Sequence, residues 1–144
     1  MQAKLYDAMV LDHRPSISQV VLSPAKLVEN DADRIDRVRT MYLESSIQSG
    51  QDCYDAASIL RRSKHSEDLI LAHDLAIIAL SYDQPMAKAL AAETEDRYLL
   101  SIGRPQRFGT QSKTNQRNRQ YDGSINPLVT QDLRVQMDVS TLKD

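Results

Sequence analysis

Alanine and leucine recur at spacings of three and four residues over residues 69–100, and this pattern constrains the fold more than any other feature. Side chains at these spacings share one face of an α-helix. Ser66 is a helix-start signal, Asp83-Gln84-Pro85 is a turn, and Gly103 is a stop signal. We therefore predict two antiparallel helices that approach closely, because small side chains let ridges fit into grooves. The small residues on the facing sides are Ala72, Ala76, Ala79, Ala87, Ala91 and Ala92.

Weaker helical patterns precede this hairpin. We predict a short helix over residues 1–12, an extended connection or a short helix over 16–29, and a clearer helix capped by Asn30 or Asp31 that runs to about Ser49. Gly50 is expected to end that helix in the left-handed conformation. Asp52 is expected to cap the next helix, which the charged run beginning at Arg61 interrupts.

The helical period disappears after Gly103. Asp122-Gly123 is a hairpin dipeptide and predicts a turn between two short strands. Residues 113–120 are polar throughout and predict a mobile loop, whereas residues 130–142 return to the body as a strand or a helix. The fold class is therefore mainly α: a compact bundle of about five helices with a polar C-terminal arm. We predict one domain over residues 1–144, with a helical body over 1–103 and the arm over 104–144.

Composition excludes several other classes. With 4 glycines and 5 prolines in 144 residues, the chain lacks the turns of a β-sandwich or barrel. It carries no apolar run of membrane-spanning length and no signal-peptide pattern, so we expect a soluble cytoplasmic protein without membrane contact. The single cysteine, Cys53, has acidic neighbours and is expected to be a small buried hydrophobic residue.

Charge is distributed unevenly along the chain. The net charge is −2, but residues 104–126 hold five basic residues and one acid, which gives +4 there and leaves −6 elsewhere. A basic arm can contact phosphates or an acidic partner. Base stacking would require more aromatic residues than Phe108 and Tyr121, so nucleic-acid binding is not expected.

One carboxylate stands out on the last helix of the body. The helical neighbours of Asp96 are apolar, and an acid on such a face needs a bonded partner. The partner is either His73 on the preceding helix or the loop of residues 106–111. Arg97 can reach Glu93 one turn back. In the first arrangement His73 and Asp96 form an acid–base pair, and in the second Asp96 locks the loop onto the bundle.

Metal binding is not expected. His65 and His73 are eight residues apart, which is roughly 12 Å along a helix, so they do not share one ion. The acids Asp31, Asp33 and Asp36 lack the glycine and closing glutamate of a calcium loop. We therefore predict neither a metal nor a cofactor.

Taken together, several residues resemble a known family. They are His65, the helical hairpin, Asp96-Arg97, Gly103, Gln106 and the string Phe108-Gly109-Thr110-Gln111. They are similar to the signature of an uncharacterised family of small microbial helical domains, over about residues 30–135. The hairpin also looks like one unit of a tetratricopeptide-type repeat. The family resemblance implies no activity, but it groups these positions as one site.

Two classes of function remain open from the sequence. The first is a binding or accessory module with a polar groove formed by His73, the Asp96-Arg97 pair and the loop. A protein or small-molecule ligand would bind through His65, Arg97, Gln106, Phe108, Thr110 and Gln111. The second is a small cofactor-independent enzyme that uses His73 and Asp96 as acid and base. The sequence assigns neither a substrate nor an oligomeric state.

Overall fold

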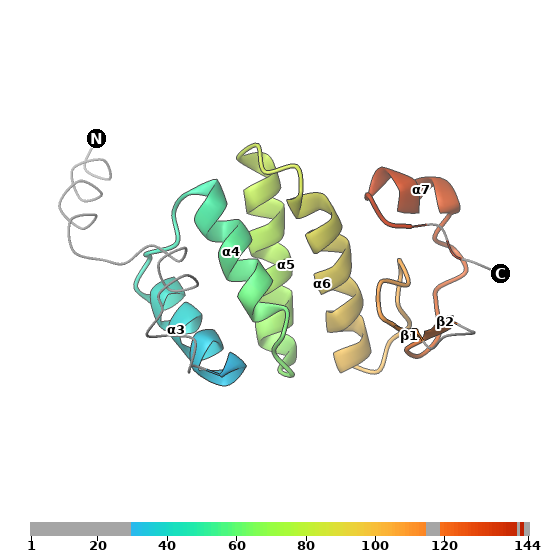
Figure 1. Cartoon of the computed structure of the whole chain (residues 1–144), viewed down its shortest axis with the longest axis horizontal. Coiled ribbons are helices and arrows are strands. Elements are labelled where there is room, and N and C mark those ends of the chain that lie inside the picture. The colour runs from blue at the N-terminus through green and yellow to red at the C-terminus, as the bar shows by residue number, and fades with distance from the viewer. Residues whose placement is uncertain (1–29, 115–118, 141, 143–144) are drawn as a thin grey trace.

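Four helices lie side by side in chain order, and the C-terminal arm packs beyond the last of them (Figure 1). The computed structural model describes residues 30–114, 119–140 and 142, so the predictions for residues 1–12 and 16–29 lie outside the described residues. The body consists of α3 (Asp31–Leu43), α4 (Gly50–Leu60), α5 (Ser66–Ser81) and α6 (Ala87–Ser101). The arm contains β1 (Ser112–Thr114), β2 (Arg119–Tyr121) and α7 (Gln131–Gln136). The expected mainly helical fold is confirmed.

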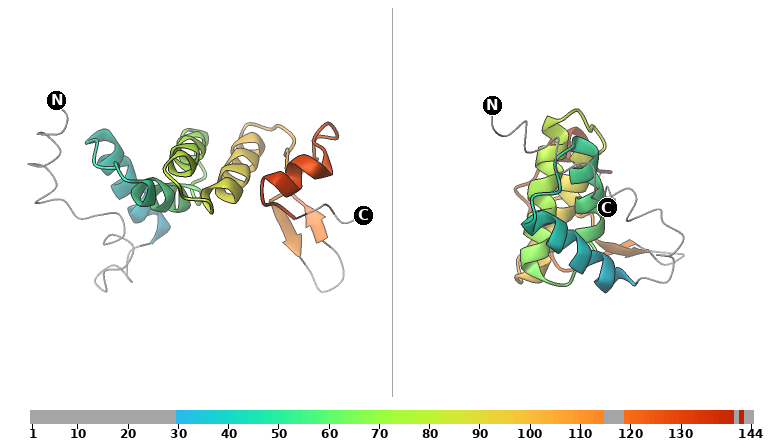
Figure 2. Two further views of the ribbon diagram at one scale, coloured as in Figure 1. Left: turned by 90° about the horizontal axis from the view of Figure 1, so that it is seen from above. Right: turned by 90° about the vertical axis from the view of Figure 1, so that its left-hand side faces the viewer.

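The core lies between α4, α5 and α6, where small side chains allow close packing. Ala76 and Ala91 are fully buried at the α5–α6 contact, as the alanine spacing predicts. Leu60 of α4 and Val38 of α3 extend the same cluster and are also fully buried. Viewed from above, the helices form a staggered row with the arm at one end (Figure 2).

Two helix ends differ from the predictions. Gly50 does not terminate α3; it is the first residue of α4, and a Cβ there would lie 2.8 Å from the Cβ of Tyr82. Glycine is needed for this close approach to the end of α5. Ser45 is left-handed after α3 instead, with a φ of 57°. Ser49 caps α4 through its hydroxyl, and the expected cap, Asp52, lies in the first turn and donates its N–H to Ser49.

The arm also differs from the predicted hairpin. β1 and β2 pair antiparallel with Ser112 opposite Tyr121, so the hairpin connection precedes Asp122-Gly123. Gly123 does have a positive φ of 65°, but it turns the chain after β2, toward Gln106. Lys113 and Gln120, expected in a mobile loop, pair across the two strands. The returning segment forms a helix, α7.

A buried carboxylate joins α3 to the start of α5. Asp68 accepts hydrogen bonds from Nε and Nη2 of Arg39 and from the hydroxyl of Ser63. Burial alone would raise the pKa of the Asp68 carboxyl, but the hydrogen bonds from Arg39 and Ser63 outweigh it, and the pKa is lowered. The ionised form of Asp68 therefore stabilises the fold.

We predict that Asp68→Asn destabilises the protein by about 1–3 kcal/mol at neutral pH, because it disrupts these bonds. Since the folded-state pKa is lowered, the stabilisation is complete above the ordinary aspartate pKa of about 3.9 and is lost as pH falls through the folded-state value. Urea denaturation from about pH 7 to about pH 2.5 should show a smaller acid-side loss in the variant.

Asp36→Asn is the matched control, because Asp36 also bonds Arg39 but its side chain is 70% exposed. It should cost less than about 1 kcal/mol. Equal stability of Asp68→Asn and the parent at neutral pH would contradict the proposed role of Asp68.

Candidate functional site

Asp96 holds the loop that follows α6. The side chain is fully buried, and its carboxylate accepts four hydrogen bonds from three loop residues. Oδ1 accepts the backbone N–H groups of Arg107 and Phe108 at 2.7 and 3.0 Å. Oδ2 accepts the N–H and the hydroxyl of Thr110 at 2.9 and 2.8 Å. The prediction that Asp96 is buried and bonded is confirmed, and of the two partners left open, the loop and His73, the loop is the one observed.

The chain reaches Asp96 because α6 ends in a sharp reversal. Gly103 has a φ of 74°, and the N–H of Arg104 bonds back to the carbonyl of Leu99 at 2.8 Å. This left-handed C-terminal cap is the conformation that glycine favours. It directs residues 107–110 back along α6, where their N–H groups meet the carboxylate.

A second buried side chain, Gln106, connects the loop to the rest of the arm. Its Nε2 donates to the carbonyls of Gln111 and Asp122, and its Oε1 accepts the N–H of Gln111. The Gln106 backbone also forms a parallel bridge with Ile125. The Gln106 side-chain amide therefore adds three hydrogen bonds to the backbone of the arm, beyond those of the short sheet.

Phe108, Thr110 and Gln111 belong to the same assembly. Phe108 is 2% exposed and packs beneath the guanidinium of Arg107. Gln111 donates from its Nε2 to the hydroxyl of Thr110 at 3.1 Å. The structure thus brings together Asp96 and four of the predicted loop residues, and it uses them to hold the loop. We call this assembly the loop anchor; it comprises Asp96, Gln106, Phe108, Thr110 and Gln111.

His73 belongs to α5 and packs against the side of α6 that faces away from the loop anchor. Its Nδ1 donates to the carbonyl of Ala91 at 2.8 Å and lies 3.5 Å from the hydroxyl of Thr94. Asp96 is two residues beyond Thr94, which places it about 200° away around the helix. Helix α6 therefore separates His73 from the carboxylate, and the contacts that each side chain makes do not join them.

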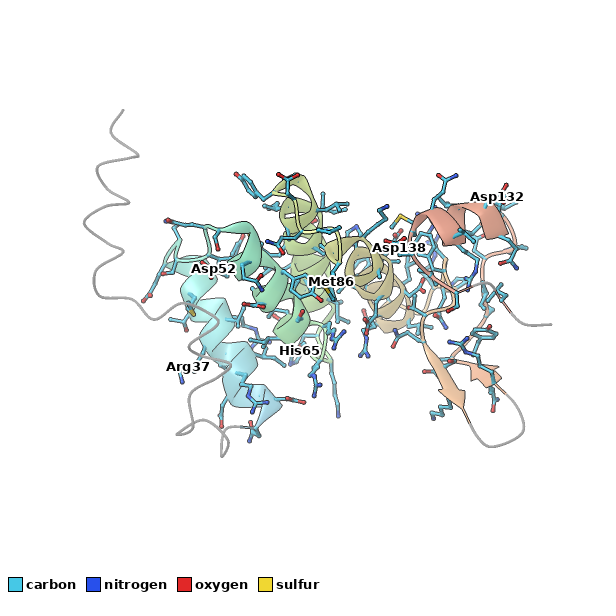
Figure 3. The ribbon with its side chains drawn as sticks, turned by 45° about the horizontal axis from the view of Figure 1, so that its top comes forward. Arg37, Asp52, His65, Met86, Asp132 and Asp138 are labelled. Atoms are coloured by element: carbon cyan, nitrogen blue, oxygen red, sulfur yellow. The ribbon has the colours of Figure 1, made fainter. Side chains whose placement is uncertain are left out.

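His65 and Arg97 also lie apart from the loop anchor. His65 occupies the N-cap position of α5 without a side-chain capping bond, and it lies apart from the arm (Figure 3). It lines a separate cavity of about 540 Å³ with Arg39, Arg62 and other residues near α3. Arg97 pairs with Glu93 at 3.3 Å, as predicted, and Arg61 of α4 bonds the same carboxylate.

A cavity opens between α6 and the arm, and we call it the arm cavity. Its volume is about 330 Å³, close to the lower limit for small-ligand sites. Four segments of the chain form its walls: α6, the anchored loop, β2, and α7 with its following turn. The lining residues are Ala89, Glu93, Gly109, Thr110, Arg119, Arg134, Asp138, Val139 and Ser140.

Gly109 is required at the wall of this cavity. Its φ is 67°, and a Cβ there would lie 2.9 Å from the side chains of Ile125 and Leu142. The same Cβ would lie 3.2 Å from the ring of Tyr121. Any larger residue would displace the loop from these neighbours, so glycine at this position keeps the cavity wall in place.

Sequence reasoning did not single out Arg134. It is the largest of the fully buried side chains among the described residues, and it lines the arm cavity. Burial lowers the pKa of its guanidinium and the charge of Arg119 acts in the same direction, while the charge of Asp96 acts in the opposite one. The available signal was a basic residue between two apolar residues, Leu133 and Val135.

Within the described ranges, no group of three or more histidine, cysteine, aspartate or glutamate side chains is placed to hold a metal ion. No described helix is both long enough and apolar enough to cross a membrane. Comparisons with family models, curated proteins and solved structures found no match. The resemblance to microbial helical domains stays a prediction that rests on its residues.

We predict that Asp96→Ala destabilises the protein by on the order of 1–3 kcal/mol, because it leaves three backbone N–H groups and one hydroxyl without their acceptor. Arg97→Ala is the control one residue away, and it should cost under about 1 kcal/mol because its pair with Glu93 is partly exposed. Urea denaturation curves of both variants test this. An Asp96→Ala variant as stable as the parent would remove the case for a loop anchor.

Proposed function

We propose that this protein is a ligand-binding module and that the arm cavity is its binding site. The main support is that the loop which forms one wall of this cavity is held in place by hydrogen bonds to the buried carboxylate of Asp96. Such a wall does not have to be ordered when a ligand binds, and this lowers the cost of binding. The volume suits a small molecule or a single side chain of a protein partner.

The same contacts favour binding over catalysis. A general base needs a free acceptor within reach of the substrate proton, and the Asp96 oxygens already accept four bonds from the loop. His73 uses Nδ1 to hold α5 against α6 through the carbonyl of Ala91. An acid–base mechanism that pairs these two residues therefore has no support in their contacts.

The proposed binding surface is the arm cavity, whose wall is held by several of the residues that the sequence predicted as the site. Thr110 is common to both, because it belongs to the loop anchor and also lines the arm cavity. Arg97, His65 and His73 have no part in it. We retain a cytoplasmic location and membership of the microbial helical-domain family as parts of this proposal, on the sequence features that suggested them.

We predict that Ala89→Phe weakens ligand binding, because the ring fills the arm cavity from the α6 side. A fragment library screened by amide chemical-shift changes on the full chain should give ligands that shift Gly109, Thr110 and Val139. Those ligands should bind Ala89→Phe at least about tenfold more weakly, a change of about 1.4 kcal/mol.

Ala32→Phe is the matched control, because Ala32 lines the separate cavity near His65. It should leave fragment binding at the arm unchanged. Fragments that bind Ala89→Phe as tightly as the parent would show that the arm cavity is not the binding site.

A further inference from the structure

Arg134 is a buried cation, and two of its three guanidinium nitrogens have no hydrogen-bond partner among the described residues. The residue is 1% exposed, and Nη2 donates to the carbonyl of Ser140 at 2.5 Å. Among the described residues, neither Nε nor Nη1 has a hydrogen-bond partner. Burying N–H groups without acceptors destabilises a fold, and more so when the group is charged. A side chain placed in this way at a cavity wall favours an anionic acceptor.

Tyr121 carries a second buried donor beside the anchored loop. Its hydroxyl is buried, and it too lacks a partner among the residues described. Its ring lies beside Gly109, which lines the arm cavity, since a Cβ at Gly109 would lie 3.2 Å from that ring. Two buried polar groups without described partners, one from β2 and one from α7, thus lie near the anchored loop.

We infer that the arm cavity binds a small carboxylate, with Arg134 as its charged partner and the hydroxyl of Tyr121 as a second donor. This rests on the proposed function, which makes the arm cavity a binding site. The negative charge of Asp96 acts on Arg134 without a hydrogen bond between them, because the Asp96 oxygens accept their hydrogen bonds from the loop.

The charges around the cavity favour a monoanion over a phosphate dianion. Glu93 and Asp138 also line the cavity, and like charges in one site oppose each other. Glu93 already pairs with Arg61 and Arg97, so it does not neutralise Arg134. Asp138 lies beside α6, with its carboxylate 4.0 Å from the ammonium of Lys88 (Figure 3). Arg119 also lines the cavity, but its Nε donates to the hydroxyl of Ser112 and its guanidinium lies over the ring of Tyr121. Arg134 is therefore the buried cation that a single negative charge would match.

The test titrates the full chain with acetate, N-acetylglycine, acetamide and inorganic phosphate, and follows the Nε–H signal of Arg134 and the amides of Gly109 and Thr110. We expect the two carboxylates to bind at least about tenfold more tightly than acetamide and more tightly than phosphate. Tighter binding of N-acetylglycine than of acetate would identify a peptide terminus as the ligand; the reverse would identify a free small acid.

Arg134→Met should abolish the preference for carboxylate over acetamide, and Arg134→Lys should retain part of it. Arg104→Met is the control, because it removes an exposed arginine outside the cavity and should change nothing. If Arg134→Met does not fold, the Nε–H signal of the parent remains decisive, since it must move with acetate.

Equal binding of acetate and acetamide in the parent would overturn the carboxylate inference and leave the proposed function standing. A preference for phosphate would also overturn it. If the fragment screen finds no ligand for the arm cavity and none of the four probes gives a response, both the carboxylate inference and the proposed binding function are wrong.

Discussion

The structure depends on one carboxylate placed between a helix and a loop. Asp96 is buried on α6, where an unpaired charge would cost several kcal/mol, and the loop supplies four donors that offset this cost. The dependence is mutual, because the N–H groups of residues 107–110 have no strand or helix of their own to satisfy them. A loop with little regular structure is held in place by the charge that it solvates.

This anchor explains why the arm can form a cavity at all. The two-stranded sheet is short, and an isolated hairpin of this kind is marginally stable in water. Gln106 links the loop to residues 111 and 122, and Gly109 lets the side chains of Ile125 and Tyr121 approach the loop. Polar bonds and one close glycine contact thus replace the hydrophobic core that the arm is too small to build.

The sequence predicted the body of the fold better than the arm. Alanine spacing identified α5 and α6 because helical period and burial give the same signal there. The burial of Asp96 was predictable too, since a lone acid on an apolar face needs a partner. The choice between His73 and the loop was not, because it depends on the reversal at Gly103. The role of Gly50 was missed, since its close contact with Tyr82 is long-range.

Arg134 shows why a site can escape sequence reasoning. Nothing within α7 requires a cation, and the helix is too short to bury one by itself. Its environment comes partly from elements distant in sequence, the loop after α6 and β2, and partly from the turn just after α7 that brings the carbonyl of Ser140 to Nη2. Asp96 contributes its charge from behind that loop. The carboxylate that holds the cavity wall thus also lowers the cost of burying the cation, while leaving Nε and Nη1 free to select a ligand.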